Sequence, residues 1–172
     1  MTMQNHFALF HLPEKFTVDG AALDAAYHAV QNQVHPDKFS TASDAEKRVA
    51  MQWATRANEA YLTLKSPLKR ASYLCELHGI DLQTESNTSM PTAFLMQQME
   101  WREALDDARA ARDDTALDAL DGALRKAREA QIAQIATSLD AQDFDTAALG
   151  VRKLMFVEKF GDEVAATFDM LA

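Results

Sequence analysis

Four prolines divide this chain into segments in which apolar residues recur at helical spacing. Proline lacks the N–H of a helix interior and restricts the residue before it, so each one is expected at a helix boundary. After Asp19, which can cap a helix, one helical face is formed by Leu23, Ala26, Tyr27, Val30 and Val34. No strand pattern and no internal repeat stands out, and only 5 glycines occur in 172 residues, so we expect an all-α fold.

Short motifs mark further helix boundaries in the N-terminal half. Residues 5–12 predict a short first helix, and Ser43 with Glu46 forms a capping box at the start of a long one. The residues expected to face inward from the long helix are Val49, Trp53, Ala57, Ala60, Tyr61 and Leu64. Pro67 opens the next helix, which ends at Gly79. Its expected inward residues are Leu68, Ala71, Leu74 and Leu77.

The C-terminal half has the pattern of three more helices. A polar stretch at 83–89 lacks periodicity and predicts a linker. Gly161 and Asp162 are expected to kink or break the last helix, which begins near Asp143. Three antiparallel helices make a small bundle. The predicted organisation is a domain at 1–79, a linker at 80–90 and a three-helix bundle at 91–172.

The net charge of −9 is unevenly placed. The first 79 residues hold 8 basic and 8 acidic side chains, so the acidic excess lies after them. An acidic chain without a basic stripe argues against nucleic-acid binding, and no apolar run approaches the roughly 20 residues of a membrane span. No basic region followed by an apolar stretch begins the chain, so we expect a cytoplasmic protein.

Catalytic and metal sites have little support. Cys75 is the single cysteine, which excludes an internal disulfide and a thiolate cluster made by this chain alone, and we expect it to be a core residue. The 5 histidines lack metal-ligand spacing, and no glycine-rich phosphate loop occurs. We therefore expect no enzymatic activity, no cofactor and no metal. A helical-bundle enzyme, active without any partner, is one alternative.

The segment His35-Pro36-Asp37, followed by Lys38, is a charged and proline-stiffened loop between two helices whose apolar faces lie elsewhere. The alternative interpretation is a loop that only uses a helix-stopping proline and a turn-forming aspartate. The segment resembles the signature of a J-domain. Residues 7–10 (FALF) resemble the first helix of that family, and residues 57–64 (ANEAYLTL) resemble its third-helix signature. The resemblance implies that His35, Pro36, Asp37 and Lys38 contact a DnaK-type ATPase chaperone, with the Asp37 carboxylate offered to an arginine.

Later segments narrow the resemblance to the HscB family, the J-protein co-chaperones of bacterial iron–sulfur cluster biogenesis. These segments are residues 67–74 (PLKRASYL), 77–81 (LHGID), 94–96 (FLM) and 151–154 (VRKL). The resemblance implies an L-shaped molecule, made of a J-domain and a three-helix bundle. It also implies two partners, an HscA-like chaperone and the IscU-like cluster scaffold protein. We expect a monomer. A J-protein adaptor that serves a different client is the alternative function.

Charge on the second helix departs from the J-domain pattern. J-domains usually carry Lys or Arg on its exposed face, but here no Lys or Arg lies between Lys15 and Lys38. The positions expected to be exposed hold Asp24, His28, Gln31, Asn32 and Gln33. Long-range attraction to the chaperone should therefore be weak, and Lys38, Lys47 and Arg48 must supply what positive potential there is.

The helix that begins near Pro91 has a second apolar face. At about 100° per residue, Phe94, Trp101, Leu105 and Ala108 form one core stripe, and Leu95, Met96 and Met99 lie on another face. Burial of that second face is the alternative, although flexible Met beside acidic residues is typical of adaptable binding surfaces. The HscB resemblance implies that the scaffold binds Leu95, Met96, Met99, Glu100, Glu103 and Phe156. By the same count Phe156 lies off the core stripe of its own helix.

Overall fold

The structure, a computed structural model, describes residues 5–82 and 90–172, and all regular elements in them are helices. Along the chain they are α1 (His6–Leu9), α2 (Gly20–Val34), the 3₁₀ turn η1 (Pro36–Phe39), α3 (Asp44–Lys65), α4 (Pro67–Leu77), α5 (Thr92–Ala111), α6 (Asp114–Asp140) and α7 (Phe144–Leu171). The predicted all-α class is confirmed. The chain divides into two compact units, Met1–Leu74 and Cys75–Ala172, and the division falls inside α4. Residues 83–89 of the predicted linker at 80–90 lie outside the described residues.

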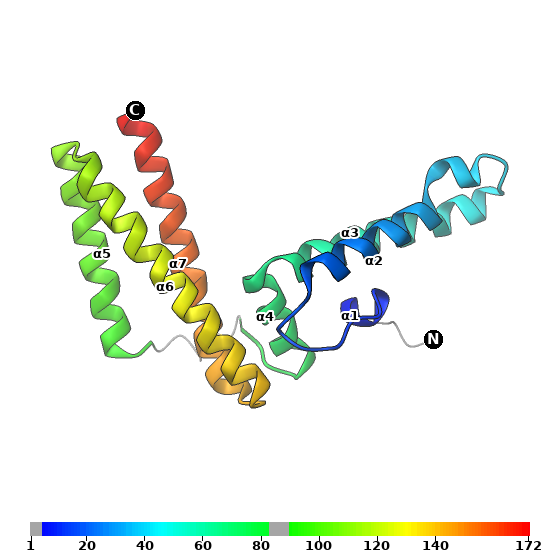
Figure 1. Ribbon diagram of the computed structural model, residues 1–172, viewed down its shortest axis with the longest axis horizontal. Coiled ribbons are helices and arrows are strands. Elements are labelled where there is room, and N and C mark those ends of the chain that lie inside the picture. Colours follow the sequence, from blue (N-terminus) through cyan, green and yellow to red (C-terminus); the bar gives the residue numbers. More distant parts are fainter. Residues whose placement is uncertain (1–4, 83–89) are drawn as a thin grey trace. The chain divides into compact units, whose positions relative to one another are not determined.

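The N-terminal unit is built on an antiparallel hairpin of α2 and α3, with η1 at its far end and α1 packed against α3 (Figure 1). Both long helices begin at the predicted caps. Asp19 Oδ1 accepts a hydrogen bond from the Ala21 N–H at 3.0 Å, and Ser43 Oγ accepts one from the Glu46 N–H at 3.2 Å. These bonds satisfy amide groups that a first helical turn leaves without partners.

The buried strip of α3 is narrower than the sequence predicted. Its buried residues are Ala50, Ala57, Ala60 and Leu64. Val49 is 52% exposed and Trp53 is 39% exposed, so the prediction that both face inward was wrong. Leu77, at the end of α4, is also 39% exposed against prediction. Because the strip consists mostly of alanines, α2 packs closely along it, and the larger residues on either side remain partly open to solvent.

A polar and aromatic cluster joins α2 to α3 at the end of the hairpin away from η1. Asp24 accepts hydrogen bonds from Tyr61 Oη at 2.7 Å and from Lys65 Nζ at 3.0 Å. The Tyr27 and Tyr61 rings stack with centroids 4.2 Å apart, and the Tyr27 hydroxyl hydrogen-bonds Asn58. The bonds from Tyr61 and then Lys65 favour the carboxylate and lower the pKa of Asp24 below its ordinary value.

Helices α5, α6 and α7 pack as a bundle in the C-terminal unit (Figure 1). The predicted core residues Trp101, Leu105 and Ala108 of α5 are buried in one cluster. The other buried members of this cluster are Leu117, Leu120, Leu124, Val157, Phe160 and Val164. The last helix continues through Gly161, so the expected break was wrong. Burial of Phe160 and Val164 on either side offsets the roughly 1 kcal/mol that a helical glycine costs.

The buried stripe of α7 moves around the helix along its length. In the first half it includes Ala148 and Val151, and in the second half it includes Phe160 and Val164. At about 100° per residue, Val151 and Val164 lie about 140° apart. The stripe moves because the second half packs into the cluster around Trp101, to which the first half does not belong.

Candidate functional site

The segment His35–Lys38 forms the outer end of the α2–α3 hairpin. His35 follows the last residue of α2 and caps η1, in which Pro36 is the first residue. Proline has the backbone angle that this first position needs, so the sequence itself stiffens the turn. All four residues are exposed, and within the predicted loop Pro36, Asp37 and Lys38 belong to the 3₁₀ turn η1, which His35 precedes.

His35 and Asp37 are held in a defined arrangement within this turn. The Asp37 N–H donates to His35 Nδ1 at 3.2 Å, and Asp37 Oδ2 lies 3.6 Å from the same nitrogen. The hydrogen bond from the Asp37 N–H fixes the imidazole ring of His35 against the backbone of the turn. The Asp37 side chain is 91% exposed. An exposed carboxylate on a stiff turn is suited to a charge-assisted hydrogen bond with a partner's arginine.

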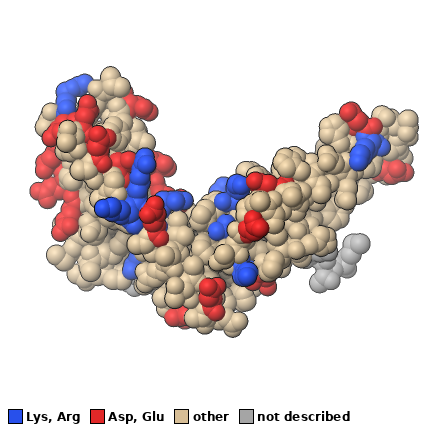
Figure 2. Space-filling view, viewed as in Figure 1, with Lys and Arg blue, Asp and Glu red and all other residues tan. Residues whose placement is uncertain are grey.

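The rest of the hairpin offers little charge to a partner. Helix α2 contains no Lys or Arg, and its one acidic residue, Asp24, is engaged by Tyr61 and Lys65. Figure 2 shows the hairpin face as mostly neutral between its two ends, whereas acidic side chains are scattered over the bundle. The cations near the turn, all exposed, are Lys38, Lys47 and Arg48.

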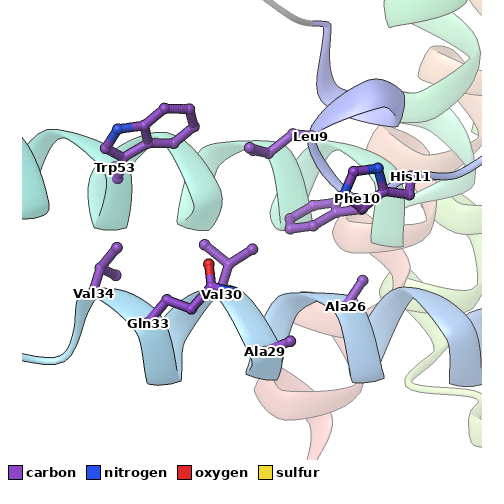
Figure 3. Close-up of a pocket in the computed structure, with 9 residues that line it drawn as sticks. All are labelled: Leu9, Phe10, His11, Ala26, Ala29, Val30, Gln33, Val34 and Trp53. Carbon is purple, nitrogen blue, oxygen red and sulfur yellow. The ribbon is translucent and has the colours of Figure 1, made fainter.

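Two apolar hollows flank α3 near this end of the hairpin. In the hollow drawn in Figure 3, of about 360 Å³, Val30 and Val34 of α2 lie across from Leu9 and Trp53. The second hollow, of about 410 Å³, has Val34 in common with the first. Its other lining residues are Pro36, Phe39, Ser40, Lys47, Ala50, Met51 and Ala54. Sequence reasoning did not identify Met51, whose only signal is a large apolar side chain beside the buried strip.

The residues of α5 predicted to bind the scaffold are all exposed. Leu95, Met96 and Met99 are 44%, 58% and 71% exposed, and Glu100 and Glu103 are exposed as well. The bundle therefore does not bury the second apolar face of α5, and the alternative of a core stripe against α7 does not hold.

Phe156 differs from the prediction, because it is a half-buried residue that packs on the core of the bundle. Its ring centroid lies 6.3 Å from that of Trp101, 5.7 Å from that of Phe160 and 5.8 Å from that of Phe94. The buried stripe of α7 has moved at this point of the helix, so a helical wheel centred on the first half placed Phe156 wrongly.

A hollow of about 610 Å³ at the surface of α5 and α7 brings part of the predicted set together. The hollow is lined by Met99, Glu103 and Phe156 of that set. The other three predicted residues, Leu95, Met96 and Glu100, do not line it. Sequence reasoning missed the other lining residues, which are Gln98, Arg102, Asp106 and Asp107. The last three continue the face of Met99 at helical spacing, so periodicity counted from Met99 could have found them.

Arg102 is the one cation that lines this hollow, and it is already paired. Its Nη1 donates to Glu163 Oε2 of α7 at 2.5 Å, and its guanidinium lies 4.8 Å from the Phe160 ring centroid. The hydrogen bond from Arg102 lowers the pKa of Glu163. The hollow therefore combines an apolar part at Met99 and Phe156 with acidic side chains, which suits a partner with apolar and basic residues.

Neither catalysis nor metal binding gains support from the described residues. Cys75 is buried, as predicted, and burial raises the pKa of its thiol to about 11, which disfavours a nucleophilic thiolate. In residues 5–82 and 90–172, no three His, Cys, Asp or Glu side chains gather as a metal site. Among the described helices, none is long and apolar enough to cross a membrane.

Comparisons with known proteins agree on one family. The family model described as the HSCB C-terminal oligomerisation domain matches residues 90–165. A co-chaperone protein HscB homolog of Burkholderia multivorans is 58% identical over 167 residues, which are 97% of this chain and 95% of the relative. The homolog of Burkholderia vietnamiensis is 57% identical over the same shares of both chains.

Two solved structures share the fold over nearly the whole chain. The chaperone HscB from Vibrio cholerae is 39% identical, with a TM-score of 0.86, over 98% of this chain and 100% of the other. The human co-chaperone protein HscB is 28% identical, with a TM-score of 0.90, over 96% of this chain and 83% of the other. Identity of this extent over almost the full length of both chains shows that this chain belongs to the HscB co-chaperone family.

Proposed function

We propose that this chain stimulates ATP hydrolysis by a DnaK-type, HscA-like chaperone. On this proposal it also delivers an IscU-like scaffold protein to that chaperone during iron–sulfur cluster maturation and transfer. On this proposal the chain catalyses no reaction itself, and the cluster stays on the scaffold as cargo. His35, Pro36, Asp37 and Lys38 contact the chaperone, and the exposed face of α5 binds the scaffold.

The observation that carries the proposal is the turn at the outer end of the hairpin. His35 and Asp37 are exposed, ordered by each other and by Pro36, and absent from the core. Such a turn contributes little to folding, but it presents a carboxylate in a fixed position to a partner. Membership in a co-chaperone family supports a chaperone as that partner.

The test is the ATPase rate of the HscA-like chaperone with and without this protein. Asp37→Asn should abolish the stimulation and leave the melting temperature unchanged, because the side chain is 91% exposed. Asp44→Asn, which changes an exposed acid at the start of α3, is the matched control and should stimulate normally. Full stimulation by Asp37→Asn would refute the assignment of the turn.

The scaffold-binding part of the proposal rests on the exposed face of α5. Met99→Ala should weaken scaffold binding by about 1–2 kcal/mol, which is roughly a five- to thirtyfold rise in Kd. Met170→Ala is the control, because Met170 is 65% exposed on α7 but lies outside the hollow. Titration calorimetry with the scaffold measures both. Equal scaffold affinities for the two variants would show that the scaffold binds another surface of this protein.

A combined variant tests whether the two surfaces act separately. Leu95→Ala/Met96→Ala/Met99→Ala should keep the basal ATPase stimulation and lose the extra stimulation that the scaffold adds. Stimulation without any scaffold binding would instead favour an adaptor for a different client. The expected monomer is measured by sedimentation, which matters because the matching family model is described as an oligomerisation domain.

A further inference from the structure

The second hollow beside the turn, defined above by its lining residues, is not used by the contacts proposed so far. It is walled by Pro36 and Phe39 of the turn and by Lys47 and Met51 of α3. No residue of α1 lines it, whereas Leu9 of α1 helps to close the hollow on the other flank (Figure 3). Met51 is 71% exposed, so a large flexible apolar side chain stands at the edge of an open hollow.

We infer that this hollow binds an apolar side chain of the same DnaK-type chaperone, an inference that rests on the proposed function. Burial against Met51 and Phe39, with Lys47 as the one charged lining residue, supplies docking affinity that α2 cannot supply through charge. An apolar anchor in a pocket beside a polar contact is the arrangement in which a few residues carry most of the affinity of an interface.

Continuity of the surface identifies the occupant. Pro36 belongs to the turn that presents Asp37, and it is also a wall of the hollow. A partner that covers Pro36 and binds the Asp37 carboxylate therefore lies directly beside the hollow. An apolar group that fills it gains burial without a second loss of translational and rotational freedom, because the two contacts belong to one docking event.

The charge distribution points the same way. Helix α2 has no cation, and Asp24 is engaged by Tyr61 and Lys65. Near the turn the cations Lys38, Lys47 and Arg48 are offset by the acidic residues Asp37, Asp44 and Glu46. With no net charge there to steer a partner over long distance, the affinity must come from short-range contacts.

The experiment measures the concentration of this protein that gives half-maximal stimulation of the chaperone ATPase. Met51→Glu places a charge at the hollow and should raise that concentration about tenfold or more, and Met51→Ala should raise it about threefold. Val49→Glu is the matched control, because Val49 is a 52% exposed apolar residue of the same helix that does not line the hollow. It should stay within about twofold of wild type. Melting temperatures should be unchanged for all three variants.

Salt dependence is the second measurement. Between about 0.05 M and 0.3 M salt, the half-maximal concentration for wild type should change less than about threefold, because an apolar contact is not screened. A steep rise with salt would show that charge dominates docking and would overturn the inference.

Asp37→Asn separates this inference from the proposed function. If wild type does not stimulate the chaperone at all, the proposed function fails and the inference fails with it. If Asp37→Asn abolishes stimulation while both Met51 variants behave like wild type, only the inference is overturned. It is also overturned if Val49→Glu is as impaired as Met51→Glu. A Met51→Glu change that alters only self-association in sedimentation, or only scaffold affinity, would assign the hollow to a second copy or to the client.

Discussion

Phe156→Ala should destabilise the bundle far more than Met99→Ala, although both residues line the same hollow. A fully buried Phe→Ala change costs about 3–5 kcal/mol. Phe156 is half-buried and loses contacts to the rings of Trp101, Phe160 and Phe94, so we expect about 2 kcal/mol. Met99 is 71% exposed, and its truncation should cost less than about 0.5 kcal/mol.

The assay can be confined to the bundle, because the chain has 2 tryptophans and only Trp101 lies in the C-terminal unit. In a Trp53→Phe background, urea unfolding followed by tryptophan fluorescence reports on the surroundings of Trp101. In a unit of this size, 2 kcal/mol corresponds to a melting temperature lower by roughly 8–16 °C. Met170→Ala is the control for an exposed methionine. A loss below about 0.5 kcal/mol for Phe156→Ala, or above about 1 kcal/mol for Met99→Ala, would refute the reasoning from burial.

Three further predictions follow from single residues. A Cβ on Gly150 would lie 2.8 Å from a side-chain carbon of α6, so Gly150→Ala should lower the free energy of unfolding by about 1–3 kcal/mol. A Cβ on Gly161 would have no atom within 4 Å, so Gly161→Ala should raise the free energy of unfolding by about 0.5–1 kcal/mol. Equal urea midpoints for these two variants would contradict the close approach of α6 and α7. Because burial raises the pKa of Cys75 to about 11, a thiol reagent near neutral pH should label the native protein very slowly, and labelling as fast as in urea would contradict this. Asp24 has a lowered pKa because Tyr61 and Lys65 donate to its carboxylate, so its contribution to stability is present above its ordinary pKa and is lost as the pH falls through the lowered value. Wild type should therefore be more stable than Asp24→Asn near neutral pH, and the difference in urea unfolding should shrink as the pH falls below the ordinary pKa of the carboxyl, 3.8. A difference in stability that stays constant as the pH falls would contradict the pairing.

Local chemistry explains what was predictable from the sequence. Helix ends depend on residues within one turn, so Asp19 and Ser43 predicted the starts of α2 and α3, and Pro36 predicted the end of α2. The core stripe of α5 was also predictable, because Trp101 and Leu105 repeat at the helical period on a helix that packs on one side only. The exposure of the turn was predictable because His35 and the residues after it lie outside the apolar faces of the two adjoining helices.

The sequence by itself determined the all-α class and the helix boundaries marked by caps and prolines, whereas the first helix is shorter than predicted and α7 continues through Gly161. Only the tertiary structure decided which neighbour each helix face meets. Val49 and Trp53 have core-like character but lie outside the narrow strip that α2 covers. Phe156 joins the core because the stripe of α7 turns toward Trp101 in its second half. The hollow at Pro36 and Met51 also exists only because η1 returns against α3. The physical reason is that periodicity records how apolar a face is, whereas burial depends on the shape and reach of the element packed against it.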